Sequence, residues 1–124
     1  MLLDSNIIIY AAEPGYDGVR DFIAQQEPKI SVISKVEVLG YHKLMPETQQ
    51  VLERLFQVLP MLPVSNAIIE QAICLRQQHH KNMSLGDSLI AATALTHHLK
   101  LVTNNVKDFA WIEQLEIINP IRLG

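Results

Sequence analysis

Short apolar runs alternate with helical patterns along this chain, and polar clusters mark the junctions between them. Four such clusters occupy residues 4–6, 34–37, 84–87 and 103–108. Three of them follow recognisable strands, at 1–3, 29–33 and 100–103. Alternation of this kind is typical of an open parallel α/β sheet. In such a sheet the strand-to-helix junctions gather along one edge, where ligands bind. Carboxylates far apart in the sequence can therefore meet in one pocket.

The same periodicity predicts the remaining elements. Helices are expected over 5–12, 17–26, 34–44, from Pro46 onward, 65–80 and 84–99, and two further short strands over 58–62 and 116–118. No internal repeat or linker interrupts the pattern. We therefore expect residues 1–124 to form a single domain, since a chain of this length buries about two thirds of its surface on folding.

Composition excludes several classes of protein. Hydrophobic residues make up 48% of the chain, which is too many for a disordered one. No apolar run approaches the roughly 20 residues that a membrane span needs. The chain opens on a strand without the basic start of a signal peptide, so a cytoplasmic protein is expected. Cys74 is the single cysteine and lies in an apolar stretch, which predicts a buried, reduced thiol.

The formal net charge of −3 argues against a nucleic-acid binder, which usually carries a basic surface. Clustered carboxylates lower this sum, however, and a bound metal ion reverses the local charge. Four lysines near the polar clusters could contact phosphate, although solvated surface lysines are the commoner case: Lys35, Lys43, Lys81 and Lys107.

The acids in the polar clusters allow two readings. Ser34 with Glu37, and Ser84 with Asp87, have the spacing of a helix-capping box, and Asn105 with Asp108 offers a similar cap. Asp4 or Ser5 can likewise cap the first helix. A carboxylate at every junction exceeds what capping requires, because serine or glutamine would serve. Together, four such acids favour a shared site for a hard divalent cation, which prefers oxygen ligands.

Four segments resemble the PIN-domain family, in particular its VapC-like toxins. They read LDSN, SVISKVEVL, SLGDSLIAATA and LVTNNVKDF, and their order and spacing span essentially the whole chain. The resemblance implies a three-layer α/β/α sandwich with a small parallel sheet of four to five strands. It also implies a metal-dependent ribonuclease that cuts RNA and is usually the toxin of a toxin–antitoxin pair.

Three acids match the principal acids of the family: Asp4, Glu37 and Asp87. The fourth position falls on Asp108 or Asn105, and we favour Asp108. The resemblance then implies that Mg²⁺ or Mn²⁺ is held by carboxylates, with Asp4 and Asp87 as the main ligands.

Polar support is expected from Ser5, Asn6, Thr103 and Asn105. Glu37 could orient the attacking water or bind a second metal ion.

Two other functions stay open at this point. A catalytically silent PIN-fold module would act by binding alone. A receiver-like phosphotransfer domain also gathers acids at a sheet edge, but it would want a second early acid where Asn6 stands.

Apolar side chains at 51–56 and 67–69 look surplus to a small sheet. They predict a homodimer, as the resemblance does.

Overall fold

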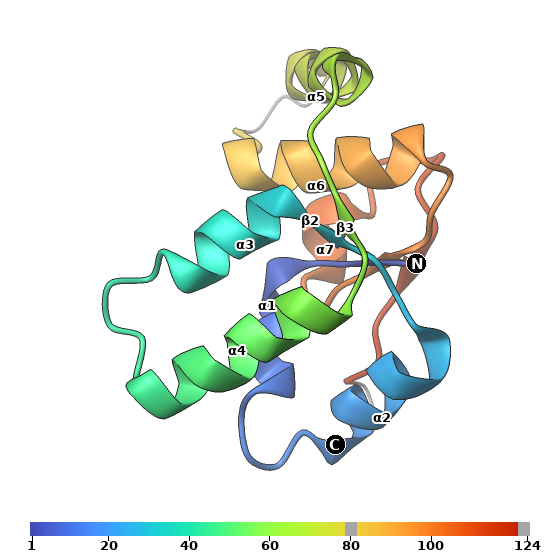
Figure 1. Cartoon of the computed structure of the whole chain (residues 1–124). Coiled ribbons are helices and arrows are strands. Elements are labelled where there is room, and N and C mark those ends of the chain that lie inside the picture. Colours follow the sequence, from blue (N-terminus) through green and yellow to red (C-terminus); the bar gives the residue numbers. More distant parts are fainter. Residues whose placement is uncertain (79–81, 122–124) are drawn as a thin grey trace.

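The computed structural model describes residues 1–78 and 82–121, and the strands of this part all run parallel (Figure 1). They are β1 (Leu2–Leu3), β2 (Ile30–Ser31), β3 (Met61–Leu62), β4 (Leu101–Val102) and β5 (Ile117–Ile118). β4 lies between β1 and β5, and β2 pairs with β3. The backbone of Lys29 joins the two groups: its N–H donates to Met1 O at 2.8 Å, and its carbonyl accepts from Leu3 N–H at 3.0 Å. The lateral order is therefore β3-β2-β1-β4-β5.

Helices cover both faces of this sheet (Figure 1). They are α1 (Ser5–Ala11), α2 (Asp17–Gln26), α3 (Val32–Leu39), α4 (Pro46–Val58), α5 (Asn66–Gln78), α6 (Leu85–Thr96) and α7 (Val106–Phe109). Successive strand residues point to opposite faces. Leu2 and Leu101 accordingly pack with α5, α6 and α7, whereas Leu3 and Val102 pack with α1 to α4. This arrangement confirms the expected three-layer α/β/α sandwich with a small parallel sheet.

The helix predicted over 34–44 begins and ends earlier than its sequence pattern indicates. It spans Val32–Leu39, because Ser31 rather than Ser34 is its N-cap and accepts a hydrogen bond from Ile33 N–H at 3.1 Å. Gly40 then ends the helix with its N–H bonded to Val36 O. The predicted capping box of Ser34 and Glu37 is therefore wrong, and both residues lie inside α3.

The strand predicted over 58–62 is also shorter. α4 continues to Val58, and the strand is confined to Met61–Leu62. Pro60 restricts the residue before it to extended backbone, and Leu59 adopts φ −85° and ψ 142° at the end of the helix. The helix predicted over 65–80 appears as α5; its expected last residues, His79 and His80, lie outside the described residues. Within the described ranges, no helix has the length and apolar character needed to cross a membrane.

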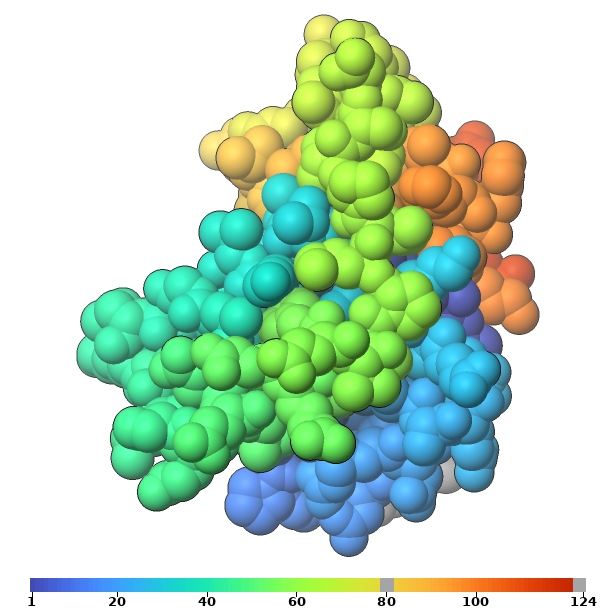
Figure 2. Space-filling view, in the orientation of Figure 1, coloured from blue at the N-terminus to red at the C-terminus, as the bar shows by residue number. Residues whose placement is uncertain are grey.

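The predicted burial of Cys74 is wrong, since this residue is exposed on α5. It shares the helix with Ile69 and Ile73, which are 42% and 45% exposed. The helix forms one end of the molecule (Figure 2). Its sequence is apolar on more than one face, so the pattern alone did not show which side faces the core.

Candidate functional site

Asp4 stands at the carboxyl end of β1, and its side chain is 5% exposed. It caps α1, with its Oδ1 accepting from Ser5 N–H at 2.8 Å. Its Oδ2 accepts from the Thr103 hydroxyl at 2.7 Å. Thr103 is fully buried and follows β4, the strand beside β1. Two neighbouring strand ends thus fix both oxygens of one buried carboxylate.

Burial raises the pKa of Asp4 above its ordinary value, because the charged form loses water. The hydrogen bonds from Thr103 and from Ser5 N–H oppose this rise. The negative charges of Glu37 and Asp108 add to it. Asp4 is therefore influenced by acids from two other elements, α3 and α7.

Asp87 lies in the first turn of α6, where Ser84 Oγ accepts its N–H at 3.0 Å as the predicted cap. Burial and the charges of Asp4, Asp108 and Glu37 raise the pKa of Asp87 to about 6, against a smaller opposing effect of Ser84. Asp4 and Asp87 therefore both lie within electrostatic reach of Glu37 and Asp108. Their individual roles stay predictions.

Glu37 projects from α3 and connects that helix to α1. Its Oε1 accepts from the Ser5 hydroxyl at 2.8 Å, and Ser5 Oγ lies 2.9 Å from Ser34 Oγ. Ser34 is fully buried, and sequence reasoning missed this contact by treating Ser34 as a cap. A signal was present, because residues three apart share one face of a helix.

The segment 103–108 supplies backbone as well as side-chain groups. Asn105 N–H donates to Thr103 Oγ1 at 3.0 Å, so Thr103 links this loop to Asp4. Asn105 is exposed and makes no side-chain cap on α7. Asp108 is exposed in α7, and its charge acts on both Asp4 and Asp87. Whether Asp108 or Asn105 takes the fourth position of the site stays a prediction.

Asn6 follows in the first turn of α1, and its Oδ1 is buried without a hydrogen-bond partner among the described residues. A buried carbonyl oxygen of this kind is costly unless a donor or cation satisfies it.

The donor set fits a hard divalent cation, since it consists of carboxylate oxygens with an amide oxygen close by in the sequence. Repulsion between these acids is relieved by positive charge. As they stand, no three Asp, Glu, His or Cys side chains in the part of the chain that the structure describes are grouped so that they could hold a metal ion. Binding therefore requires the carboxylates to adjust.

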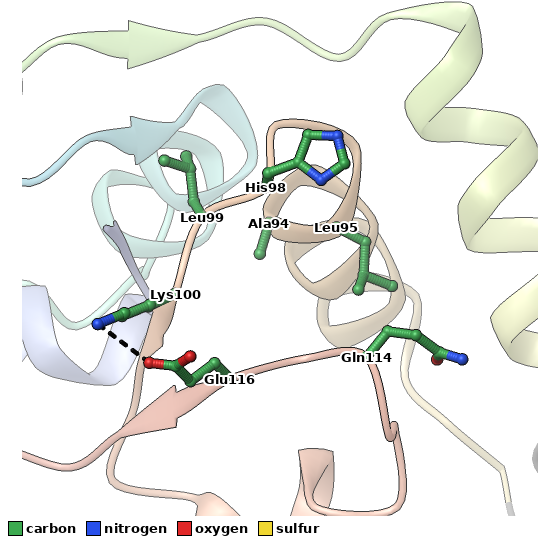
Figure 3. Close-up of a pocket in the computed structure, with 7 residues that line it drawn as sticks. All are labelled: Ala94, Leu95, His98, Leu99, Lys100, Gln114 and Glu116. Atoms are coloured by element: carbon green, nitrogen blue, oxygen red, sulfur yellow. Dashed lines mark ion pairs between the residues drawn. The ribbon is translucent and has the colours of Figure 1, made fainter.

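A separate cavity of about 460 Å³ lies at the opposite, amino ends of the strands (Figure 3). Its lining includes His98, Lys100, Gln114 and Glu116. Lys100 Nζ and Glu116 Oε2 form an ion pair at 3.0 Å, so its one carboxylate already has a cationic partner. The acids described above are absent from it, and we do not assign the chemistry to this cavity.

Comparison with known proteins gives consistent matches. The model of the PIN domain matches residues 1–113. "Ribonuclease VapC1" of Rickettsia felis is 30% identical, covering 95% of this chain and 94% of that protein. A toxin–antitoxin complex from Klebsiella pneumoniae contains a similar chain, with 30% identity, 96% coverage of both chains and a TM-score of 0.76. DNA-bound VapBC from Salmonella typhimurium reaches a TM-score of 0.84 at 21% identity and 96% coverage of both chains, which shows the shared fold.

The raised pKa of Asp87 predicts how stability depends on pH. Between about pH 6 and pH 4, the folded protein binds a proton at Asp87 that the unfolded chain does not, so the free energy of unfolding rises as pH falls. Asp87→Asn removes the carboxyl group that titrates, and with it this contribution to the pH dependence. Without divalent cations, the variant should be more stable than wild type at pH 7.5 by no more than about 1–2 kcal/mol, since half-exposed charges are screened.

Urea unfolding at pH 7.5 and pH 4 measures this difference. The difference in free energy of unfolding between Asp87→Asn and wild type should nearly vanish at pH 4. Equal stabilities at both pH values would contradict the electrostatic account of Asp87.

Proposed function

Because the chain belongs to the PIN-domain family, we propose that it is a metal-dependent ribonuclease and the toxin of a toxin–antitoxin pair. The observation that carries the proposal is the buried Asp4 carboxylate, which Thr103 holds at the sheet edge within reach of the charge of Asp87. The similarity to VapC1, a protein named as a ribonuclease, supports the activity.

Asp4 and Asp87 would hold Mg²⁺ or Mn²⁺, with Asp108 as a further ligand through water. When bound, the cation makes a water molecule more acidic and neutralises charge on the phosphate that is cleaved. The protein's own part is to fix the Asp4 oxygens through Ser5 N–H and Thr103. Glu37, which points from α3, orients the attacking water and accepts its proton at a carboxylate oxygen.

RNA is bound through exposed lysines on the helices that carry the acids. Lys35 lies two residues before Glu37 on α3, and Lys107 precedes Asp108 on α7; both are exposed. Their ammonium groups would contact backbone phosphates and offset the net charge of −3. Lys81, the other candidate near Asp87, lies outside the described residues.

Cleavage of RNA tests the proposal. We expect Mn²⁺-dependent cutting of a single-stranded RNA of random sequence by the wild type, measured by loss of fluorescence quenching. Asp4→Asn and Asp87→Asn should each lower the rate by at least about 10²-fold, because asparagine keeps the shape but loses the charge that binds the cation.

Asp21→Asn is the matched control, since Asp21 is an exposed acid on α2, and it should cut at the wild-type rate. RNA binding without cleavage by the wild type would instead indicate a silent binding module. If Asp87→Asn cuts RNA at the wild-type rate, Asp87 has no role in cleavage and serves only the capping of α6.

The antitoxin would dock beside Glu37. A cavity of about 430 Å³ opens between α1, α3 and α4. Its polar lining residues are Glu13, Glu37, Tyr41, Lys43 and Thr48. Its walls are mainly apolar and include Ile9, Leu44 and Met45. An apolar helix that carries a basic side chain would fill the cavity and place its positive charge against Glu37. The toxin–antitoxin complex from Klebsiella pneumoniae, whose chain resembles this one, supports such a partner.

A charge introduced in the cavity should weaken this association. Met45 is 61% exposed, so Met45→Lys should leave the fold intact. Because its positive charge repels the basic side chain of the partner, it should lower affinity at least about tenfold for the protein encoded by the neighbouring reading frame. Isothermal titration calorimetry measures the change. Val58→Lys is the control, because Val58 is an exposed residue at the far end of α4 and lies outside the cavity. Equal affinities for both variants would place the antitoxin elsewhere.

The homodimer would form through α5. Of the side chains that look surplus in the sequence, Leu52, Phe56 and Ile68 belong to the core. Ile69 is exposed, and Ile73, four residues further along α5, is exposed on the same face of the helix. An exposed apolar helix face at one end of the molecule suits a two-fold contact (Figure 2).

Light scattering at micromolar concentration should give twice the 14.0 kDa mass of the chain. Ile73→Glu should shift the protein to a monomer, because a charge in the contact loses water without gaining a partner. Val51→Glu, at an exposed position on α4, should stay a dimer. A wild-type monomer that cuts RNA would refute this assembly.

A further inference from the structure

The Glu37 carboxylate is enclosed from two sides, although its residue is exposed on α3. The hydroxyl of Ser5, on α1, bonds to Oε1 at 2.8 Å. On the other side stands Gly86, in the first turn of α6. A Cβ at Gly86 would lie 2.3 Å from Glu37 Oε2, closer than such atoms approach in proteins. Three helices therefore meet at this one carboxylate.

The Ser5 side of this enclosure has a buried anchor. A carboxylate oxygen can only accept, and Ser5 carries a single hydroxyl proton. Since that proton serves Glu37, the hydroxyl of Ser34 supplies the proton between the two serines, 2.9 Å apart. Ser34 is fully buried, so close packing restricts the movement of its side chain. Ser34, Ser5 and Glu37 thus form a hydrogen-bonded chain that ends at Oε1.

Gly86 needs a reason to be glycine, because alanine is the better residue in a helix. Its backbone does not supply one, since its φ is not in the left-handed region. The three atoms nearest to an added Cβ are all carboxyl atoms of Glu37, at 2.3, 3.1 and 3.5 Å. The missing side chain therefore leaves room for this carboxylate.

We propose that Gly86 is a positioning residue: its bare Cα and the Ser34–Ser5 hydroxyl chain form a seat that holds the Glu37 carboxylate beside Asp87. The inference rests on the proposed function, in which Glu37 acts on the attacking water. A small displacement of such a group slows a reaction strongly, because the reacting atoms lose alignment.

Gly86→Ala tests the seat without disturbing the core. The only atoms that must move belong to the flexible end of Glu37. The variant should unfold at the same urea concentration as wild type or a higher one. Its kcat on the random RNA with Mn²⁺ should fall on the order of 10²-fold, with KM little changed.

Gly18→Ala is the matched control, because Gly18 is the second residue of α2 as Gly86 is of α6, and nothing lies within 4 Å of its added Cβ. It should keep the wild-type kcat.

A second measurement follows the carboxylate itself and needs neither metal nor RNA. In protein with ¹³C-labelled glutamate carboxyls, the Glu37 resonance, assigned with Glu37→Gln, should move in Gly86→Ala and in Ser5→Ala. It should stay close to its wild-type position in Ser5→Thr, which keeps the hydroxyl, and in Gly18→Ala.

A double-mutant cycle completes the test. In the Glu37→Ala background, Gly86→Ala should cause no further loss of kcat. Equal losses with and without Glu37, or an unmoved Glu37 resonance in Gly86→Ala, would overturn the seat.

If Asp87→Asn is inactive while Gly86→Ala turns over like wild type, the seat fails and the proposed function stands. If Asp87→Asn also cuts normally, the proposed function fails.

Discussion

The hydrogen bonds of Asp4 tie the site to the fold. Its carboxylate is almost fully buried at the end of the central strand, where an unpaired charge would be costly. Ser5 N–H and the Thr103 hydroxyl satisfy its two oxygens, and Thr103 in turn accepts from Asn105 N–H. This arrangement requires β1 and β4 to be adjacent and parallel, because only then do their carboxyl ends meet. The order of the strands thus decides which groups surround the Asp4 carboxylate, which the sequence alone leaves open.

Repulsion among the acids affects both the stability of the protein and its affinity for a cation. Asp4 and Asp87 both have pKa values raised by burial first and by neighbouring carboxylates second. Repulsion of this kind lowers the free energy of unfolding of the metal-free protein at neutral pH. A bound cation would relieve the repulsion and raise that free energy. The cost is tolerable because two hydrophobic clusters, one on each face of the sheet, carry the stability.

Most of the fold follows from the sequence, because helical periodicity and strand position are local properties. The acids could be assigned to one sheet edge for the same reason. Local pattern failed where a tertiary contact decides. Spacing favours Ser34 as the cap, because Glu37 follows it by three residues. In the structure β2 pairs with β3 only as far as Ser31, and α3 begins directly after it. The burial of Ser34 against Ser5, the approach of Glu37 to Gly86 and the exposure of Cys74 all depend on how helices pack.

The proposed cleavage of RNA depends on the binding of a divalent cation by the acids at the carboxyl ends of the strands. Crystals of the protein soaked in Mn²⁺ and measured at the manganese absorption edge test it directly. The account predicts an anomalous peak in contact with the carboxylates of Asp4 and Asp87 at that edge of the sheet. A peak at Glu116 in the opposite cavity, or none near Asp4, would contradict it.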